Sequence, residues 1–128
     1  MKCFSFVARR LCWHPQIIML PETLNKIEER VRTVESITPQ QRSELLGLLA
    51  TLKAEVAGLP ATHQDQAQSI AGFTAVSAHE ATRDGRDPEL VQLSIQGLSR
   101  SVGGFEESHP KLVQAVNSIC TMLSNLGI

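Results

Sequence analysis

Apolar residues recur at alternating steps of three and four along most of this chain, and no other feature limits its possible folds as much. Side chains with this spacing lie on one face of an α-helix. Four segments show the pattern, at Leu24, Ile27, Val31 and Val34, at Leu45, Leu49, Leu52 and Val56, at Val91, Ile95, Leu98 and Val102, and at Leu112, Val116, Ile119, Leu123 and Leu126. The spacing predicts four amphipathic helices.

Boundary residues around the second segment support this division. Thr38 precedes Pro39, and Gln41 follows the threonine by three residues, an arrangement that predicts a capping box at a helix start. Gly58 and Pro60 predict the end of the same helix. The second helix is therefore the best-marked element in the sequence.

A weaker helical pattern follows it. Thr62 is expected to cap a third helix, with Ile70, Phe73 and Val76 facing inward. Turn-forming residues at positions 83–88 end that helix and supply an Asp-Pro start for the next one. This segment brings the expected number of helices to about five.

Composition agrees with a helical fold. The chain has 128 residues, of which 42% are hydrophobic but only 4% aromatic, with no tyrosine. A core made of Leu, Ile, Val and Ala favours helices over β-sheets. Each stripe spans only about two heptads, a length suited to antiparallel hairpins. We expect an all-α fold, an antiparallel helical bundle of about five helices built from helical hairpins, with residues 20–128 as one domain.

The first nineteen residues differ from the rest. Arg9 and Arg10 interrupt the apolar runs, so residues 1–19 match neither a signal peptide nor a membrane span. We expect a flexible leader, or an extension that precedes a true translation start at Met19. An amphipathic membrane anchor around Trp13 is the alternative.

Charge and cysteine content narrow the function. The formal net charge of −1 provides no electrostatic attraction to nucleic acid, and the last helix offers only Lys111 as a basic residue. The three cysteines show no Cys-x-x-Cys spacing, which favours a reduced, cytoplasmic protein. Cys120 has apolar neighbours and is expected to be a small core residue rather than a nucleophile.

The stretch FEESHP contains the residues that most resemble a site, namely Phe105, Glu106, Ser108, His109 and Pro110. Ser108 or His109 can cap the last helix, and Pro110 suits its first turn. Neighbouring side chains point in different directions, so Ser108 and His109 are not expected to form a nucleophile and base pair. We interpret the stretch as a helix start and predict no catalytic residue.

FEESHPKL, followed by a Leu-rich helix that ends in LSNLGI, resembles the C-terminal signature of a family of short, mainly proteobacterial proteins of unknown function. The resemblance covers Leu98–Ile128 most clearly, and more weakly the LPETLNKIEERV segment that starts at Leu20. The matching residues are Phe105, Glu106, Ser108, His109, Pro110, Gly127 and Ile128. The leader before Met19 departs from the pattern. The resemblance implies a helical bacterial protein and no known activity.

Other residues with metal-binding chemistry are scattered along the chain. HEATR lacks the second histidine of a zincin, because Arg83 stands in its place. Imidazole and carboxylate groups that converge between helices are the alternative, and their sources are His63, Asp65, His79, Glu80 and His109. We expect no metal and no cofactor.

Apolar residues outside the main stripes, including Ile37, Leu46 and Leu48, suggest an oligomer interface. We therefore expect a cytoplasmic, self-associating structural or protein-interaction accessory, not an enzyme. Its partners would be itself, as a homodimer or larger, and an unknown protein, without nucleic acid or membrane. The alternative function is a small-ligand or metal-binding bundle that uses His109 and nearby acids. A membrane-surface role depends entirely on the leader.

Overall fold

The computed structural model describes residues 22–127, and over these it is an all-α helical bundle. The first helix covers residues 22–33 of the described part. It is followed by α2 (Pro39–Ala57), the short 3₁₀ helix η1 (Ala61–His63), α3 (Gln64–Thr82), α4 (Pro88–Ser101) and α5 (Pro110–Gly127). This confirms the expected fold class and the expected number of about five helices. The expectations for residues 1–19 lie outside the described part.

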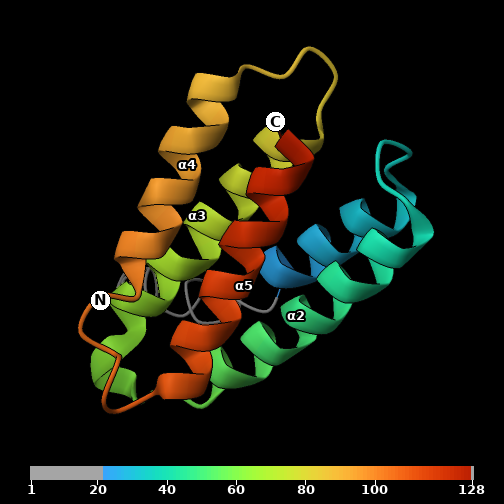
Figure 1. The fold of residues 1–128 in the computed structure, drawn as a ribbon. Coiled ribbons are helices and arrows are strands. Elements are labelled where there is room, and N and C mark those ends of the chain that lie inside the picture. The colour runs from blue at the N-terminus through green and yellow to red at the C-terminus, as the bar shows by residue number, and fades with distance from the viewer. Residues whose placement is uncertain (1–21, 128) are drawn as a thin grey trace, which may run out of the picture.

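The helices form two hairpins with α5 packed against both (Figure 1). In that view the first helix runs beside α2, while α3 runs beside α4. Helix α5 lies between α4 and α2 and also contacts α3. Because α5 touches three other helices, its apolar side forms the middle of the core.

The apolar stripes predicted from the sequence form that core. Almost all of their side chains are buried, and only Val34 and Leu126 at two stripe ends are partly buried. Seven stripe positions are completely inaccessible, Leu52, Val91, Leu98, Leu112, Val116, Ile119 and Leu123. The spacing of three and four therefore predicted the inner faces of the first helix, α2, α4 and α5.

Helix α3 departs from the expectation. Ile70 is buried, but Phe73 and Val76 are 40% and 49% exposed, so the prediction that they face inward is wrong. The buried side of α3 consists mainly of small residues, Ala67, Ala71, Thr74, Ser77, Ala78 and Ala81. Small side chains let neighbouring helices approach closely, which leaves no room for a phenylalanine on that side.

The buried hydroxyls of the α3–α4 hairpin donate to backbone carbonyls of their own helices. Thr74 donates to the carbonyl of Ile70 at 2.6 Å, and Ser77 donates to the carbonyl of Phe73 at 2.5 Å. Ser94 on α4 donates within its own helix as well, to the carbonyl of Val91 at 2.9 Å. A buried hydroxyl bonded in this way avoids the penalty of an unsatisfied polar group.

Of the starts of α2, α3 and α4, two follow the sequence. The backbone N–H of Gln41 donates to the Thr38 hydroxyl at 3.1 Å, and the Thr38 N–H donates to the Gln41 side chain at 3.0 Å, which confirms the capping box. The Asp87 carboxylate caps α4 by accepting from the N–H of Glu89 at 3.0 Å. The prediction for Thr62 is wrong, because η1 precedes α3 and places His63 at the N-cap position.

Polar contacts tie the first helix to its neighbours. Lys53 donates to Glu28 and to Asn25, both at 2.9 Å, and Arg30 donates to the Thr82 hydroxyl at 3.0 Å. The Arg42 guanidinium donates to carbonyl groups at the end of the first helix, including that of Val31. Unsatisfied carbonyls at a helix end need such donors, so Arg42 stabilises the turn that leads into α2.

Candidate functional site

The FEESHP stretch forms the connection between α4 and α5. Gly104 adopts a positive φ of 94°, and its N–H donates to the Glu106 carboxylate at 2.9 Å. The N–H of His109 donates to the carbonyl of Phe105 at 2.8 Å. The chain therefore turns tightly here, and Pro110 becomes the first residue of α5.

The aromatic ring of Phe105 holds this connection against η1. Phe105 is only 4% exposed, and two histidine rings meet it edge to face. The ring centroids lie 5.3 Å apart for His63 and 5.5 Å apart for His109. Edge-to-face contacts of this kind add to the stabilisation from apolar burial. Phe105 therefore anchors the connection to the bundle.

Ser108 and His109 do meet, contrary to the sequence argument. The Ser108 hydroxyl lies 3.0 Å from Nδ1 of His109. Neighbouring side chains on a helix or a turn were expected to point apart, but in this turn the two adjacent side chains converge. Ser108 is exposed, and the carbonyl of His109 accepts the Val113 N–H at 3.3 Å, as an N-cap residue does. The contact stands at the surface, at the start of α5.

His63 and His109 both contact the Phe105 ring, but the five metal-ligand candidates do not converge as one group. His63 stands before the first turn of α3, whereas His79 and Glu80 stand in its last turn, which separates them by roughly 24 Å at 1.5 Å per residue. Glu80 forms an ion pair with Arg83 at 2.8 Å. Within residues 22–127 no group of three or more His, Cys, Asp or Glu side chains is placed to hold a metal ion.

Glu106 and His109 have the Glu-x-x-His spacing that places two ligands together on a helix in bundle metal sites. The segment that contains them is a turn, so the spacing does not have its helical meaning here. The Glu106 carboxylate instead accepts from the Gly104 N–H.

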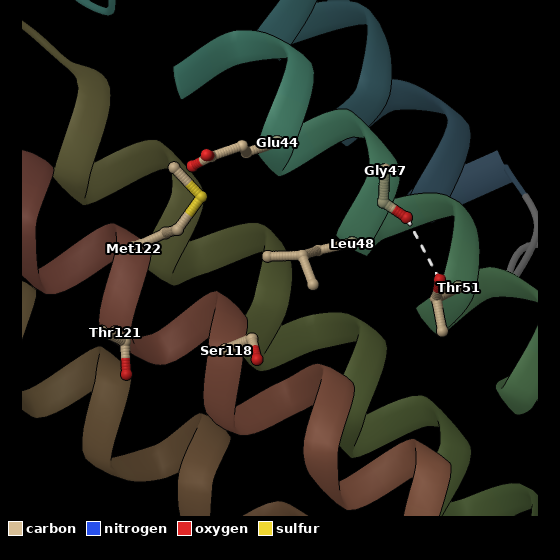
Figure 2. Close-up of a pocket in the computed structure, with 7 residues that line it drawn as sticks. All are labelled: Glu44, Gly47, Leu48, Thr51, Ser118, Thr121 and Met122. Atoms are coloured by element: carbon tan, nitrogen blue, oxygen red, sulfur yellow. Dashed lines mark hydrogen bonds between the residues drawn. The ribbon is translucent and has the colours of Figure 1, made fainter. Parts of the chain in front are cut away.

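An open groove of about 560 Å³ runs between α2 and α5 (Figure 2). It is lined by Glu44, Gly47, Leu48, Thr51, Ser118, Thr121 and Met122. Leu48 points from α2 toward α5, and the Met122 side chain extends toward Glu44. The Thr51 and Thr121 hydroxyls donate to carbonyls of their own helices, at 3.2 and 3.1 Å. Glu44 is therefore the one charged group in a lining of small and apolar residues.

A smaller polar hollow of about 300 Å³ lies where the first helix meets the end of α3. Arg30 and Thr82 line it and are bonded to each other. Arg83 also lines it and is paired with Glu80. Both arginines of the hollow therefore already have partners, and Glu35 and Asp84 are the other charged residues that line it.

Among residues 22–127 the large hydrophobic side chains that are exposed lie on one hairpin. Phe73, Val76, Leu90 and Leu93 are 40%, 49%, 43% and 61% exposed, and we call them the α3–α4 face. The Phe73 ring lies against Gly97 of α4, where an added Cβ would stand 2.3 Å from a ring carbon. Residues three or four positions apart share a helix face, so Val76 continues from Phe73 and Leu93 from Gly97.

This face was not predicted from the sequence. The apolar residues off the main stripes suggest Ile37, Leu46 and Leu48 for an interface, but Ile37 is 6% exposed and the two leucines are partly buried against the core. The signal was present on α4, because Leu90 and Leu93 fall outside the stripe that contains Val91, Ile95 and Leu98.

Comparisons with models of protein families, with curated proteins and with solved structures found no significant match to this chain. The resemblance to the family of short bacterial proteins therefore stays a prediction. Among residues 22–127 no single helix is long and apolar enough to cross a membrane. The combination of Pro39–Ala57 with Ala61–Thr82 meets those two conditions, but as a pair bent by 119°.

Proposed function

We propose that this protein is a self-associating accessory protein that acts through protein contacts rather than catalysis, and that the α3–α4 face makes the contact. The observation that carries the proposal is the exposure of Phe73, Val76, Leu90 and Leu93 on adjacent helices. Scattered apolar residues are normal on protein surfaces, whereas a contiguous group of large ones marks an interaction site more often.

The rest of the chain is compatible with self-association. The formal net charge is −1, so two copies repel each other only weakly. A domain of 128 residues also gains proportionally more from burying surface in a partner than a large domain does. Leu93, the most exposed of the four, would lose the most contact with water in a complex.

Light scattering coupled to size-exclusion chromatography tests the proposal. Between 1 and 200 µM, the mass of the full chain should rise from 14.0 kDa toward a multiple of it. Leu93→Lys should stay at the single-chain mass, because it places a charge in the middle of the α3–α4 face. Asn117→Lys makes the same change in charge at an exposed position of α5 and should behave as the wild type.

Two outcomes would overturn the proposal. A wild-type chain that keeps the mass of one copy throughout this range does not self-associate. A Leu93→Lys chain that assembles as the wild type does would exclude the α3–α4 face as the contact. Far-UV circular dichroism of each variant establishes that the helices remain folded.

A further inference from the structure

We infer that the second copy binds in one specific orientation, with the two α4 helices antiparallel about a twofold axis and Glu89 of each copy paired with Arg100 of the other. This inference rests on the proposed self-association and specifies the partner of the α3–α4 face. Its basis is the order of apolar and charged residues along α4.

Three residues of α4 define one outward stripe. Glu89, Leu93 and Arg100 follow each other at steps of four and seven, so they lie within a narrow arc of the helix. The buried residues Val91, Ile95 and Leu98 occupy the opposite side. An exposed leucine therefore stands between an acid and a base, which are roughly 16 Å apart along the axis.

Within residues 22–127 neither charge of the stripe forms an ion pair, and Glu89 and Arg100 are both exposed. Other charged groups of the bundle do form ion pairs, namely Glu80 with Arg83 and Glu28 with Lys53. The two free charges stand at opposite ends of α4.

Opposite charges at the two ends of a stripe select an antiparallel partner. In a twofold dimer each contact between residues i and j is repeated as j and i. Antiparallel α4 helices then form the Glu89 and Arg100 pair twice, whereas parallel helices would place like charges together. The stripe is complementary to itself in one direction only.

The same register gives the exposed leucine an apolar contact. When Glu89 is opposite Arg100, Leu93 of each copy lies opposite Gln96 and next to Gly97 of the other. Gly97 has no side chain, and the Phe73 ring covers it. Leu93 of one copy therefore meets the Phe73 ring of the other, and the charged pairs lie at the rim, as in many protein interfaces.

Helix dipole effects provide a competing explanation of the two charges. An acid in the first turn and a base in the last turn stabilise any helix, without a partner. The two explanations differ in what happens when variants with opposite changes are mixed.

The experiment uses Glu89→Arg and Arg100→Glu in the full chain, alone and mixed in equal amounts, with self-association measured by sedimentation velocity. Each variant alone should bind itself at least about tenfold more weakly than the wild type, since like charges face each other at both ends. The mixture should recover wild-type affinity within about threefold, because the two chains carry opposite charges at both ends of the stripe. The double variant Glu89→Arg/Arg100→Glu should recover it as well, and 0.5 M salt should narrow all differences.

The outcomes separate this inference from the proposed function. If the wild type assembles and the single variants assemble equally well, or if the mixture does not recover, the antiparallel orientation is wrong and self-association stands. A dipole role alone predicts loss of stability in both variants without recovery on mixing. A wild-type chain that remains a monomer overturns the orientation and the proposed function together.

Discussion

The ring of Phe73 lies against Gly97, so close that a Cβ atom at position 97 would stand 2.3 Å from a ring carbon. At this contact α3 contributes the large Phe73 side chain, and α4 contributes a glycine, which has no side chain. Phe73 is nevertheless 40% exposed. The contact therefore fixes the hairpin and contributes to its outer surface at the same time.

Gly97→Ala tests the closeness of this contact. Replacing a helical glycine by alanine usually stabilises by about 1 kcal/mol, but here the new methyl must displace the Phe73 ring. We expect no gain in the free energy of unfolding from Gly97→Ala in the wild type, and a gain of about 1 kcal/mol in a Phe73→Ala background. Urea denaturation followed by circular dichroism measures both.

Gly72→Ala is the matched control, because apart from its chain neighbours and the nearby backbone of its own helix no atom lies within 4 Å of its added Cβ. It should raise the free energy of unfolding by about 1 kcal/mol in either background. An equal gain from Gly97→Ala in the wild type would show that the ring does not occupy this position.

Thr38→Ala removes half of the capping box at the start of α2. The N–H of Gln41 then loses its acceptor, and the free energy of unfolding should fall by about 1 kcal/mol. Thr38→Ser should retain most of the stability. Thr121→Ala removes an exposed hydroxyl that only bonds within α5, so a change below about 0.5 kcal/mol is expected. Equal losses at both threonines would argue against the cap.

Lys53→Met tests the link between the first helix and α2. The Glu28 side chain is 10% exposed and accepts from Lys53, so the substitution leaves a nearly buried carboxylate unpaired. We expect a loss of about 1 to 2 kcal/mol in the free energy of unfolding. The double variant Glu28→Gln/Lys53→Met should recover part of it, because no unpaired charge remains. Lys26→Met, at an exposed position of the first helix, should have little effect on the free energy of unfolding. A comparable loss from Lys26→Met would contradict a stabilising role for the Lys53 and Glu28 pair.

The Cys120 thiol should make the free energy of unfolding depend on pH. Burial raises the pKa of the Cys120 thiol above its ordinary value. The unfolded chain therefore releases this proton first, so the contribution to stability is complete below the thiol pKa of the unfolded chain, about 8.5, and is lost as the pH rises through the folded-state pKa. A Cys120→Ala chain should lose less stability between pH 8 and pH 10.5 than the wild type. Parallel curves for the two chains would contradict the raised pKa.

The same pKa predicts slow labelling of the thiol. In a Cys3→Ser/Cys12→Ser background, a thiol reagent at pH 7.5 should modify Cys120 much faster in urea than in the folded protein, because the thiolate is the reactive form. Equal rates would indicate an accessible thiol. The Cys120 sulfur lies 3.8 Å from the carbonyl oxygen of Ile95, within the α4 and α5 contact.

The sequence predicted the elements whose inner side is made of large aliphatic residues. Leu45, Leu49 and Leu52 mark the core side of α2 because their steps of four and three continue to Val56, whereas Leu46 and Leu48 fall off this stripe and are only partly buried. The capping box at Thr38 was predictable because both of its bonds are local in sequence. Local signals and long apolar stripes thus gave the fold class and four of the helices.

Helix α3 shows where such reasoning fails. Apart from Ile70, its core side consists of alanine, serine and threonine, which are not recognisable as a stripe, and its largest residue, Phe73, is 40% exposed. Phe73 packs on Gly97 because the fold places α4 beside α3, and a local sequence pattern does not contain this information. The site residues show the same limit, since the contact of Phe105 with His63 joins two turns that are distant in sequence.

The buried hydroxyls of Thr74, Ser77 and Ser94 all bond to their own helices. These groups consequently give the α3–α4 hairpin no directional bond that would prevent one helix from sliding along the other. The packing of the Phe73 ring on Gly97 does fix how α3 and α4 are aligned, because a shift of one helix by one turn along the other would break this contact. The register of this hairpin then depends on how the two side-chain volumes fit. Changes in volume at positions 73 and 97 should therefore affect the alignment of α3 with α4 more than changes in polarity do.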